Sequence, residues 1–443
     1  MRNRLLLISL VLAAWFCIGV IDYLVPGPAI LVLLCALIAV MVTHSTWLFT
    51  AQSRWMRKRR RRLPATGRQA LQVDAELWQP WVDIFVSAKN EARVIESCVR
   101  NLFKLDYDKF YVWIIDDCST DSMPDVLKVL QREFPRLKVV TRIPGGAPGK
   151  SAALNEALAL SRGEVIAVFD ADAYVAPNFL KTVIPVLAAD GVGAVQAQKR
   201  LYEHQKGFLP NCQSSEYALD TYFQMGRDLI GGAVELRGNG QLVKRTALID
   251  VGGWNNKAIT DDLDLTMRLL INDWDIRFCP HAIVWEEAVM TLKGLMRQRR
   301  RWAEGSIRRY LDYIFPLNSP SRLSLVERLD TLAFTTYFVV PALIFLQSAS
   351  ELFSYLSGRP LHASFFLLVT VAIIIISQLN FYIAIRFYRK RMPVWRAFFH
   401  TFAVNFYVFA HWMPCVFVSL SQIMFKRQAS TWHRTEHMGH PAA

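Results

Sequence analysis

Two carboxylates stand two positions apart directly after an apolar run. Residues 165–169 are VIAVF, and Asp170 and Asp172 follow in the segment FDADAYVAP at 169–177. The apolar run predicts a buried strand, beside which an unpaired carboxylate is costly in free energy. Something at the strand end must therefore neutralise these charges. A divalent cation is one candidate, and a polar turn without a function is the other.

Acidic residues also follow two other predicted strands. The run VDIFV at 82–86 precedes Glu91, and YVWII at 111–115 precedes Asp116 and Asp117. Ligands of open α/β sheets bind beyond the carboxyl ends of the strands, so we expect these side chains to share one crevice with the Asp pair. Such a group suits Mg²⁺ or Mn²⁺, which prefer oxygen ligands. Capping of the following helix is the structural alternative for the pair at 116–117.

A Gly/Pro loop supplies a cation at the same edge of the sheet. The segment GGAPGK at 145–150 ends in Lys150, and an Ala/Leu-rich helical pattern follows. Backbone N–H groups and a helix N-terminus favour a phosphate group there. The Walker pattern would need glycine at position 144, which is Pro144. The loop therefore predicts a bound nucleotide diphosphate rather than ATP hydrolysis of the P-loop type.

These residues lie within an alternation of strands and helices. LKVVT at 137–141 predicts a further strand, and helical patterns occupy 91–103 and 151–161. This spacing predicts an α/β fold with a mostly parallel, doubly wound sheet.

The bulk composition indicates a membrane protein. The 443 residues are 53% hydrophobic and have a formal net charge of +14, an unusual combination for a soluble chain. Apolar segments at 4–24 and 28–50 predict a transmembrane hairpin, and those at 329–348, 363–387 and 401–425 predict further membrane segments. Either 329–348 or 401–425 could be re-entrant instead of crossing.

The basic residues predict which side faces the cytoplasm. The run RWMRKRRRR at 54–62 follows the second apolar segment, whereas the link between the first two segments has no Lys or Arg. The positive-inside rule places the N-terminus and the chain after Arg54 in the cytoplasm. Beside a membrane segment, such a run indicates anionic lipid headgroups rather than nucleic acid as its partner.

Six motifs make residues 80–315 resemble the membrane-embedded family 2 glycosyltransferases. In family order they are SAKNEARV, IIDDCSTD, GKSAALNEAL, DADAYVAP, TDDLDLTMRL and QRRRW. Three positions depart from the family pattern, with Ser87 in place of Pro, Cys118 in place of Gly and Asp261 in place of Glu. The resemblance implies a GT-A-like fold, a UDP-sugar donor and Mg²⁺, with Mn²⁺ as an alternative.

The resemblance also implies roles for single residues. Uracil and ribose contacts would come from Glu91, Asp116, Asp117 and Lys150. The sugar-diphosphate and its metal ion would bind Asp170 and Asp172, and the diphosphate would also contact Gln298 and Arg301. Trp302 and Asp261 would border the acceptor. Asp262 would be the general base on the acceptor hydroxyl, and a single base without a second nucleophile implies inversion. Without the resemblance, residues 261–264 would suit a solvated helix start, and Trp302 an apolar helix face.

Three longer stretches resemble the β-monoglucosyldiacylglycerol synthases of cyanobacteria and related bacteria. They are RGNGQLVKRTAL, GGWNNKAITDDLDLTMRL and RQRRRWAEGSIRRYLDY. This resemblance implies transfer of glucose from UDP-glucose to 1,2-diacylglycerol at a bacterial inner or thylakoid-type membrane. A basic amphipathic helix at 291–313 would lie on anionic headgroups. The alternatives are a processive synthase of poly-N-acetylglucosamine, a cellulose-like or a hyaluronan-like polymer, and a non-catalytic nucleotide-sugar receptor.

We expect six regions along the chain. They are a transmembrane hairpin at 1–53, a basic linker at 54–80, a cytoplasmic GT-A domain at 81–290, an interfacial region with the Q-x-x-R-W motif at 291–327, C-terminal transmembrane segments at 328–425 and a tail at 426–443.

Replacing the expected base tests its role. Asp262→Asn removes the proton acceptor but keeps the size of the side chain, so transfer should fall by about a hundredfold or more. UDP binding, measured by calorimetry, should stay unchanged. A loss of UDP affinity would contradict the assignment of Asp262 as the base.

Overall fold

The computed structural model describes residues 5, 8, 9, 28–61, 78–143, 145–203, 205–318, 323–356, 363–389 and 392–425. The predicted first membrane segment at 4–24, apart from three positions, lies outside these residues. The same holds for 62–77 of the predicted linker and for the predicted tail at 426–443.

An eight-stranded sheet lies at the centre of the soluble part, in the order β3-β2-β1-β4-β7-β6-β8-β5. Its strands are β1 (Val82–Ala88), β2 (Phe110–Asp116), β3 (Leu137–Thr141), β4 (Val165–Phe169), β5 (Tyr174–Val175), β6 (Val192–Leu201), β7 (Gln241–Lys244) and β8 (Asp275–Glu286). Strands β3, β2, β1 and β4 run parallel, as predicted. Strand β7 then pairs antiparallel with both β4 and β6, so the complete sheet is mixed.

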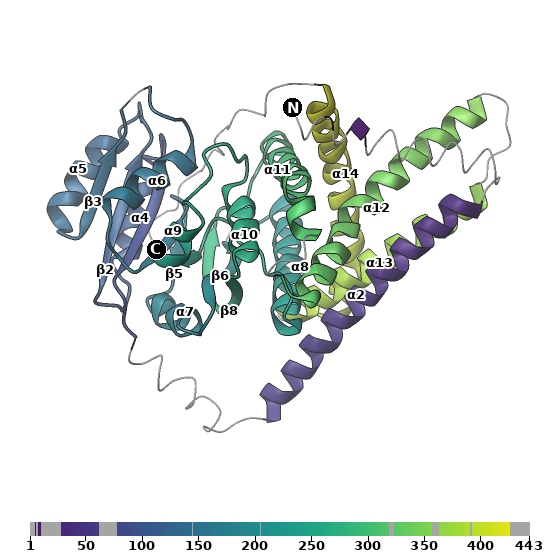
Figure 1. The fold of residues 1–443 in the computed structure, drawn as a ribbon, viewed down its shortest axis with the longest axis horizontal. Coiled ribbons are helices and arrows are strands. Elements are labelled where there is room, and N and C mark those ends of the chain that lie inside the picture. The colour runs from purple at the N-terminus through teal and green to yellow at the C-terminus, as the bar shows by residue number, and fades with distance from the viewer. Residues whose placement is uncertain are drawn as a thin grey trace.

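Both faces of the sheet are buried under helices (Figure 1). The helices of this part are α4 (Ile95–Leu102), α5 (Met123–Glu133), α6 (Lys150–Leu160), α7 (Phe179–Leu187), α9 (Arg245–Asp250) and α10 (Asp261–Ile271). Strand β4 shows how the sequence builds both cores. Val165, Ala167 and Phe169 pack into one core, and the alternating Ile166 and Val168 pack into the other.

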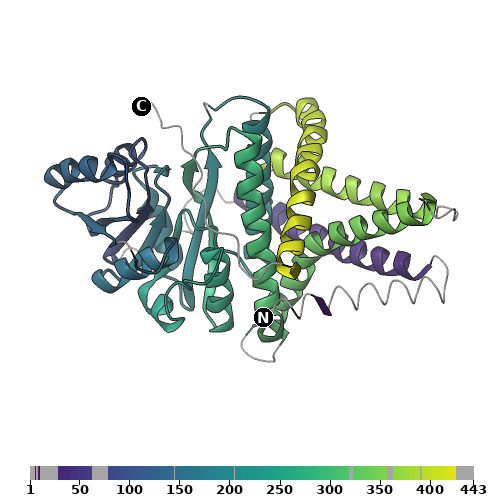
Figure 2. The same cartoon turned by 90° about the horizontal axis from the view of Figure 1, so that it is seen from above.

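Two helices connect the sheet to the long apolar helices. These two are α8 (Phe208–Ile230) and α11 (Leu292–Asn318), and the long helices are α2 (Pro28–Arg61), α12 (Leu325–Leu356), α13 (Ala363–Tyr388) and α14 (Val394–Phe425). Helix α8 packs against α2 and α13, while α11 packs against α14. Figure 2 shows the other long helices projecting away from the sheet, with α11 and α14 between.

Three described helical segments are long and apolar enough to cross a membrane: Leu33–Arg57, Val371–Tyr388 and Val394–Phe425. They overlap three of the predicted membrane segments, and α12 covers the predicted segment at 329–348. Large apolar side chains of α14 are exposed, among them Phe399 at 66% and Phe406 at 72%. Exposed apolar surface of this extent indicates contact with lipid, so the protein associates with a membrane.

Candidate active site

A cavity of about 930 Å³ collects the predicted site residues. Of these residues, all of which the structure describes, only Asp116 does not line the cavity. The residues on the wall are Glu91, Asp117, Lys150, Asp170, Asp172, Asp261, Asp262, Gln298, Arg301 and Trp302. The acidic groups that follow β1, β2 and β4 thus share one space, as their positions in the sequence predict.

The turns after β1 and β2 are tied together by side chains. Asn90 has a left-handed backbone (φ 57°), and its Oδ1 accepts hydrogen bonds from the N–H groups of Thr120 (2.6 Å) and Asp121 (3.3 Å). Asp116 is 2% exposed, and its Oδ1 accepts a hydrogen bond from the N–H of Ser119 at 2.9 Å. Asp116 therefore holds the turn that presents Asp117 to the cavity.

Arg142 fixes the carboxylate of Asp117. The buried guanidinium forms an ion pair with Asp117, and a second one with Glu156 at 2.9 Å. An Arg in a rigid pair keeps a carboxylate in one orientation, here on the cavity wall.

The Asp pair after β4 is held by backbone and side-chain contacts. The Nζ of Lys150 donates to Asp170 Oδ1 at 2.6 Å, and the N–H of Asp170 donates to Asn239 Oδ1 at 3.2 Å. Asp172 is 8% exposed, and its Oδ2 accepts the N–H of Glu287 at 2.9 Å. Burial lowers the pKa of Lys150, but the carboxylates, chiefly Asp170, outweigh it and hold this pKa above its usual value. Lys150 is therefore a cation at the strand end.

The donor set suits a metal that shares its coordination with a ligand. Among the described residues, no group of three or more His, Cys, Asp or Glu side chains is arranged to hold a metal ion. Asp170 and Asp172 nevertheless offer two carboxylates on one wall. Mg²⁺ is commonly held by one or two carboxylates together with substrate phosphates. The pair fits that mode rather than a closed protein cage.

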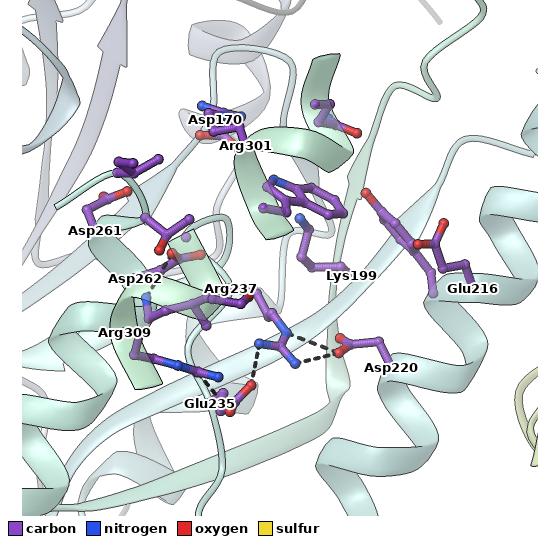
Figure 3. A pocket seen from close by; sticks show the side chains of 18 of the residues that line it. Asp170, Lys199, Glu216, Asp220, Glu235, Arg237, Asp261, Asp262, Arg301 and Arg309 are labelled. Atoms are coloured by element: carbon purple, nitrogen blue, oxygen red, sulfur yellow. Dashed lines mark hydrogen bonds and ion pairs between the residues drawn. The ribbon is translucent and has the colours of Figure 1, made fainter. Parts of the chain in front are cut away.

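Asp262 lies at the start of α10, and its side chain lines the cavity near Asp261 (Figure 3). Its Oδ1 accepts the N–H of Leu263 at 2.8 Å. Burial, and then the neighbouring Asp261 carboxylate, raise the pKa of Asp262 to about 6, against opposing effects of that N–H, Arg237 and Lys150. A carboxylate with a pKa near neutrality is suited to accept a proton from a hydroxyl.

Arg237 lines the site although no role was predicted for it from the sequence. It lines the cavity near Asp262, and its Nη2 contacts Asp220 Oδ1 at 2.8 Å. Its Nη1 contacts Glu235 Oε2 at 2.7 Å. The stretch RGNGQLV shows an arginine in a Gly-rich segment, but it does not show that Asp220 of α8 holds the side chain.

Helix α11 presents Gln298, Arg301 and Trp302 to the cavity. Burial lowers the pKa of Arg301, although the nearby carboxylates of Asp261 and Asp170 act in the opposite direction. The Cζ of Arg299 lies 4.0 Å from the centre of the Trp302 ring, a cation–π contact that orients the indole.

Two arginines of the helix predicted to lie on anionic headgroups point into the protein. Arg299 is 0% exposed and is paired with Glu216 at 2.7 Å, and Arg309 is paired with Glu235 at 2.9 Å. Both face inward because carboxylates outside the helix pair with them, which helical periodicity cannot reveal.

The cavity continues between the apolar helices. At this end its wall is formed by α2, α12, α13 and α14, with the side chains Met41, Tyr337, Ile373, Ile376, Phe409 and Met413. We call these six residues the apolar lobe. A single space thus joins acidic and basic groups at the strand ends to hydrocarbon side chains of the membrane helices.

Known proteins resemble this chain over much of its length. Residues 80–305 match the family model described as glycosyltransferase like family 2. The β-monoglucosyldiacylglycerol synthase of Nostoc sp. (strain PCC 7120) is 46% identical over 265 residues, which cover 59% of this chain and 56% of that protein. The enzyme of the same name from Synechocystis sp. (strain PCC 6803) is 49% identical over 236 residues, covering 53% and 49%. The chain spans about half the length of the curated relatives it matches.

More distant proteins also resemble the chain, one in sequence and one in its solved structure. Poly-beta-1,6-N-acetyl-D-glucosamine synthase of Staphylococcus epidermidis is 26% identical over 281 residues, 62% of this chain and 67% of that protein. The mannosyltransferase PcManGT of Pyrobaculum calidifontis, solved with GDP-Man and Mn²⁺, superposes with a TM-score of 0.61 at 20% identity, covering 88% of this chain and all of that one. The soluble part therefore has the predicted GT-A-like fold, and the chain belongs to the family 2-like glycosyltransferases.

Proposed function

We propose that the protein transfers glucose from UDP-glucose to the free hydroxyl of 1,2-diacylglycerol, with inversion at the anomeric carbon. Membership of the family supports sugar transfer. The names of the relatives at 46% and 49% identity support the lipid acceptor. The catalytic side would face the cytoplasmic leaflet, in keeping with the basic residues at 54–62.

The observation that carries the proposal is the continuous cavity. Its polar end holds Asp170, Asp172, Lys150 and Asp262, and its other end is the apolar lobe between membrane helices. A water-soluble nucleotide sugar fits the first environment, and the hydrocarbon of a lipid fits the second. The names of the relatives at 46% and 49% identity favour this lipid over a growing polysaccharide as the acceptor.

The residues of this chain account for the proton and the leaving group. Asp262 takes the proton of the acceptor hydroxyl, and the oxygen of that hydroxyl bonds to the anomeric carbon. The bond between the anomeric carbon and the diphosphate breaks in the same step. Lys150 and Arg301 would supply positive charge that stabilises the leaving diphosphate. This assigns Lys150 to the diphosphate rather than to uracil and ribose. Displacement from the opposite face converts an α-linked donor into a β-linked product.

The nucleoside and the metal are assigned to the strand ends. Glu91 and Asp117 lie on the wall beyond β1 and β2, where uracil and ribose would bind. Asp170 and Asp172 would hold Mg²⁺, which would add positive charge at the diphosphate. The solved mannosyltransferase that shares the fold was crystallised with Mn²⁺, which supports a divalent cation in this site.

A transfer assay tests the proposal. Purified protein in detergent receives UDP-[¹⁴C]glucose, diacylglycerol and Mg²⁺, and the products are partitioned between chloroform and water. We expect label in a chloroform-soluble glycolipid that depends on diacylglycerol. An insoluble labelled polymer would instead support the processive synthase, and an absence of transfer together with UDP binding would support a receptor.

Filling the apolar lobe should weaken acceptor binding selectively. Ile376 lines the lobe, so Ile376→Trp should raise the KM for diacylglycerol by about tenfold, an energy of about 1.4 kcal/mol. The KM for UDP-glucose should not change. Ile375→Trp is the matched control, because Ile375 is 59% exposed and lies off the cavity wall. An equal effect of both substitutions would refute the assignment of the lobe.

The rate of transfer should depend on the protonation of Asp262. Its pKa of about 6 places the active, ionised form above that pH, so the rate should fall about tenfold for each pH unit below it. Asp261→Asn removes a neighbouring negative charge that raises this pKa. The fall in rate at low pH, which is the acid limb of the pH–rate profile, should therefore move to lower pH by about half a unit or more. A shift to higher pH would show that another group limits the rate.

A further inference from the structure

A chain of buried ion pairs runs from the membrane helices toward the site. His44 of α2 is hydrogen-bonded through Nε2 to Asp330 Oδ1 of α12 at 2.8 Å. Asp330 Oδ2 accepts from the Nε of Arg227 at 2.7 Å, and Arg227 Nη1 lies 3.3 Å from Glu235 Oε1. Each of these four residues is at most 2% exposed. Asp330 of α12 thereby binds Arg227 of α8, and His44 of α2 supports Asp330 through a hydrogen bond.

Glu235 forms ion pairs with three arginines and so connects this chain to the site. Its Oε1 accepts a hydrogen bond from Arg309 Nη1 at 2.9 Å and lies near Arg227 Nη1. Its Oε2 accepts a hydrogen bond from Arg237 Nη1 at 2.7 Å. Asp220 holds Arg237 on the other side through Nε (3.0 Å) and Nη2 (2.8 Å). Figure 3 shows Arg237 between Asp220 and Glu235, next to Asp262.

The backbone follows the same route. Asp330 Oδ2 accepts the N–H of Ala233 at 2.9 Å, and a Cβ added to Gly232 would lie 2.7 Å from the Asp330 carboxylate. Farther along, the N–H of Leu236 donates to Thr266 Oγ1 of α10 at 2.9 Å. Gly238 packs against the base, since a Cβ there would lie 3.2 Å from Asp262 Oδ2. The segment 232–238 is thus fixed to Asp330 at one end and meets Asp262 at the other.

We propose that this ion-pair chain fixes Arg237 beside Asp262, and that His44 and Asp330 of the membrane helices are therefore positioning residues for the base. The inference rests on the proposed role of Asp262. It gives the helices that border the lipid a direct electrostatic connection to the group that deprotonates the acceptor.

The energetics favour a role beyond stability. The loss of hydration energy on burying an ion pair often cancels the attraction between its charges. Well-packed apolar side chains in the same place often stabilise a fold equally or better. Burial and Asp261 both disfavour the ionised form of Asp262, and the positive charge of Arg237 opposes them. Four charged side chains act on Asp262: Asp261 of its own helix, Lys150 of α6, Arg301 of α11 and Arg237. Only Arg237, among these described groups, is linked by the ion pairs above to a membrane helix.

Asp330→Asn tests the connection. Without the Asp330 charge, Arg227 would pair with Glu235 and compete there with Arg237. Arg237 would then be held less firmly beside Asp262, and its lowering effect on the pKa of Asp262 would weaken. We expect the acid limb of the rate profile to move to higher pH by about half a unit or more, with kcat about tenfold lower. The KM for UDP-glucose should be unchanged.

Asp228→Asn is the matched control. Asp228 directly follows Arg227 on α8, and its side chain is 7% exposed. It pairs with Arg277 at 2.7 Å and accepts the N–H of Phe278 at 3.0 Å, so it contacts β8 instead of the ion-pair chain. Its substitution should disturb stability without moving the acid limb. A shift as large as that of Asp330→Asn would mean that the effect is general destabilisation, and would overturn the proposal.

A second variant and a second readout keep the test independent of folding and of activity. Asp220→Asn, at a 35% exposed side chain, releases Arg237 from the opposite side and should move the same limb to higher pH. Carbodiimide modifies protonated carboxyl groups, so its pH-dependent labelling of Asp262, followed by mass spectrometry, reports the same titration without transfer. If the wild type transfers no glucose, the proposed function fails, but an upward shift of the labelling midpoint in both variants would still support the ion-pair chain. An unchanged midpoint in both would overturn it.

Discussion

Carboxylates gathered on one wall of a cavity repel one another unless positive charge matches them, and this requirement shapes the site. Asp170, Asp172, Asp261 and Asp262 share one cavity wall. Lys150 is bonded to Asp170, and Arg301 lies among the same carboxylates. Each cation comes from a separate element, Lys150 from the start of α6 and Arg301 from α11. The relative placement of those elements therefore sets the charge around Asp262, and an ionised Asp262 is what the proposed chemistry needs.

The second constraint is that the two proposed substrates come from different phases. A nucleotide sugar arrives from water, and a diacylglycerol stays in the bilayer, so the reacting atoms can meet only at a boundary. In this structure that boundary lies along α8 and α11, which separate the sheet from the long apolar helices. Trp302 stands at this level, oriented by Arg299, which in turn is paired with Glu216 of α8. An ion pair between α8 and α11 thus orients Trp302 at the boundary between the two halves of the cavity.

Local patterns predicted the strands that position the donor end. LKVVT at 137–141 coincides with β3, and the apolar run before Asp170 is β4. Both were predictable because a short run of apolar residues, alternating with polar ones or uninterrupted, is typical of a buried strand. The side chains at the ends of parallel strands then share a cavity as a consequence of topology. The antiparallel strand β7 between β4 and β6 was not predicted, since its four residues give no distinct periodicity.

Contacts between distant segments were beyond sequence reasoning. Asp116 resembles a site residue in a motif, but in the structure it binds the N–H of Ser119 and leaves Asp117 to face the cavity. Arg299 and Arg309 belong to a basic helix that suggested lipid headgroups, yet Glu216 and Glu235 hold them inside. Arg227 and Asp330 are separated by 103 positions, and no local pattern connects an arginine of one helix with an aspartate of another.

The central claim is that one cavity holds the nucleotide sugar and the lipid together. Photo-crosslinking tests it most directly, with a diacylglycerol that carries a diazirine near the end of one acyl chain, added with UDP and Mg²⁺ and followed by peptide mass spectrometry. The account predicts adducts at Ile373, Ile376 or Phe409 that excess unlabelled diacylglycerol suppresses. Adducts confined to lipid-facing side chains such as Ile375 and Phe406, insensitive to that competition, would contradict it.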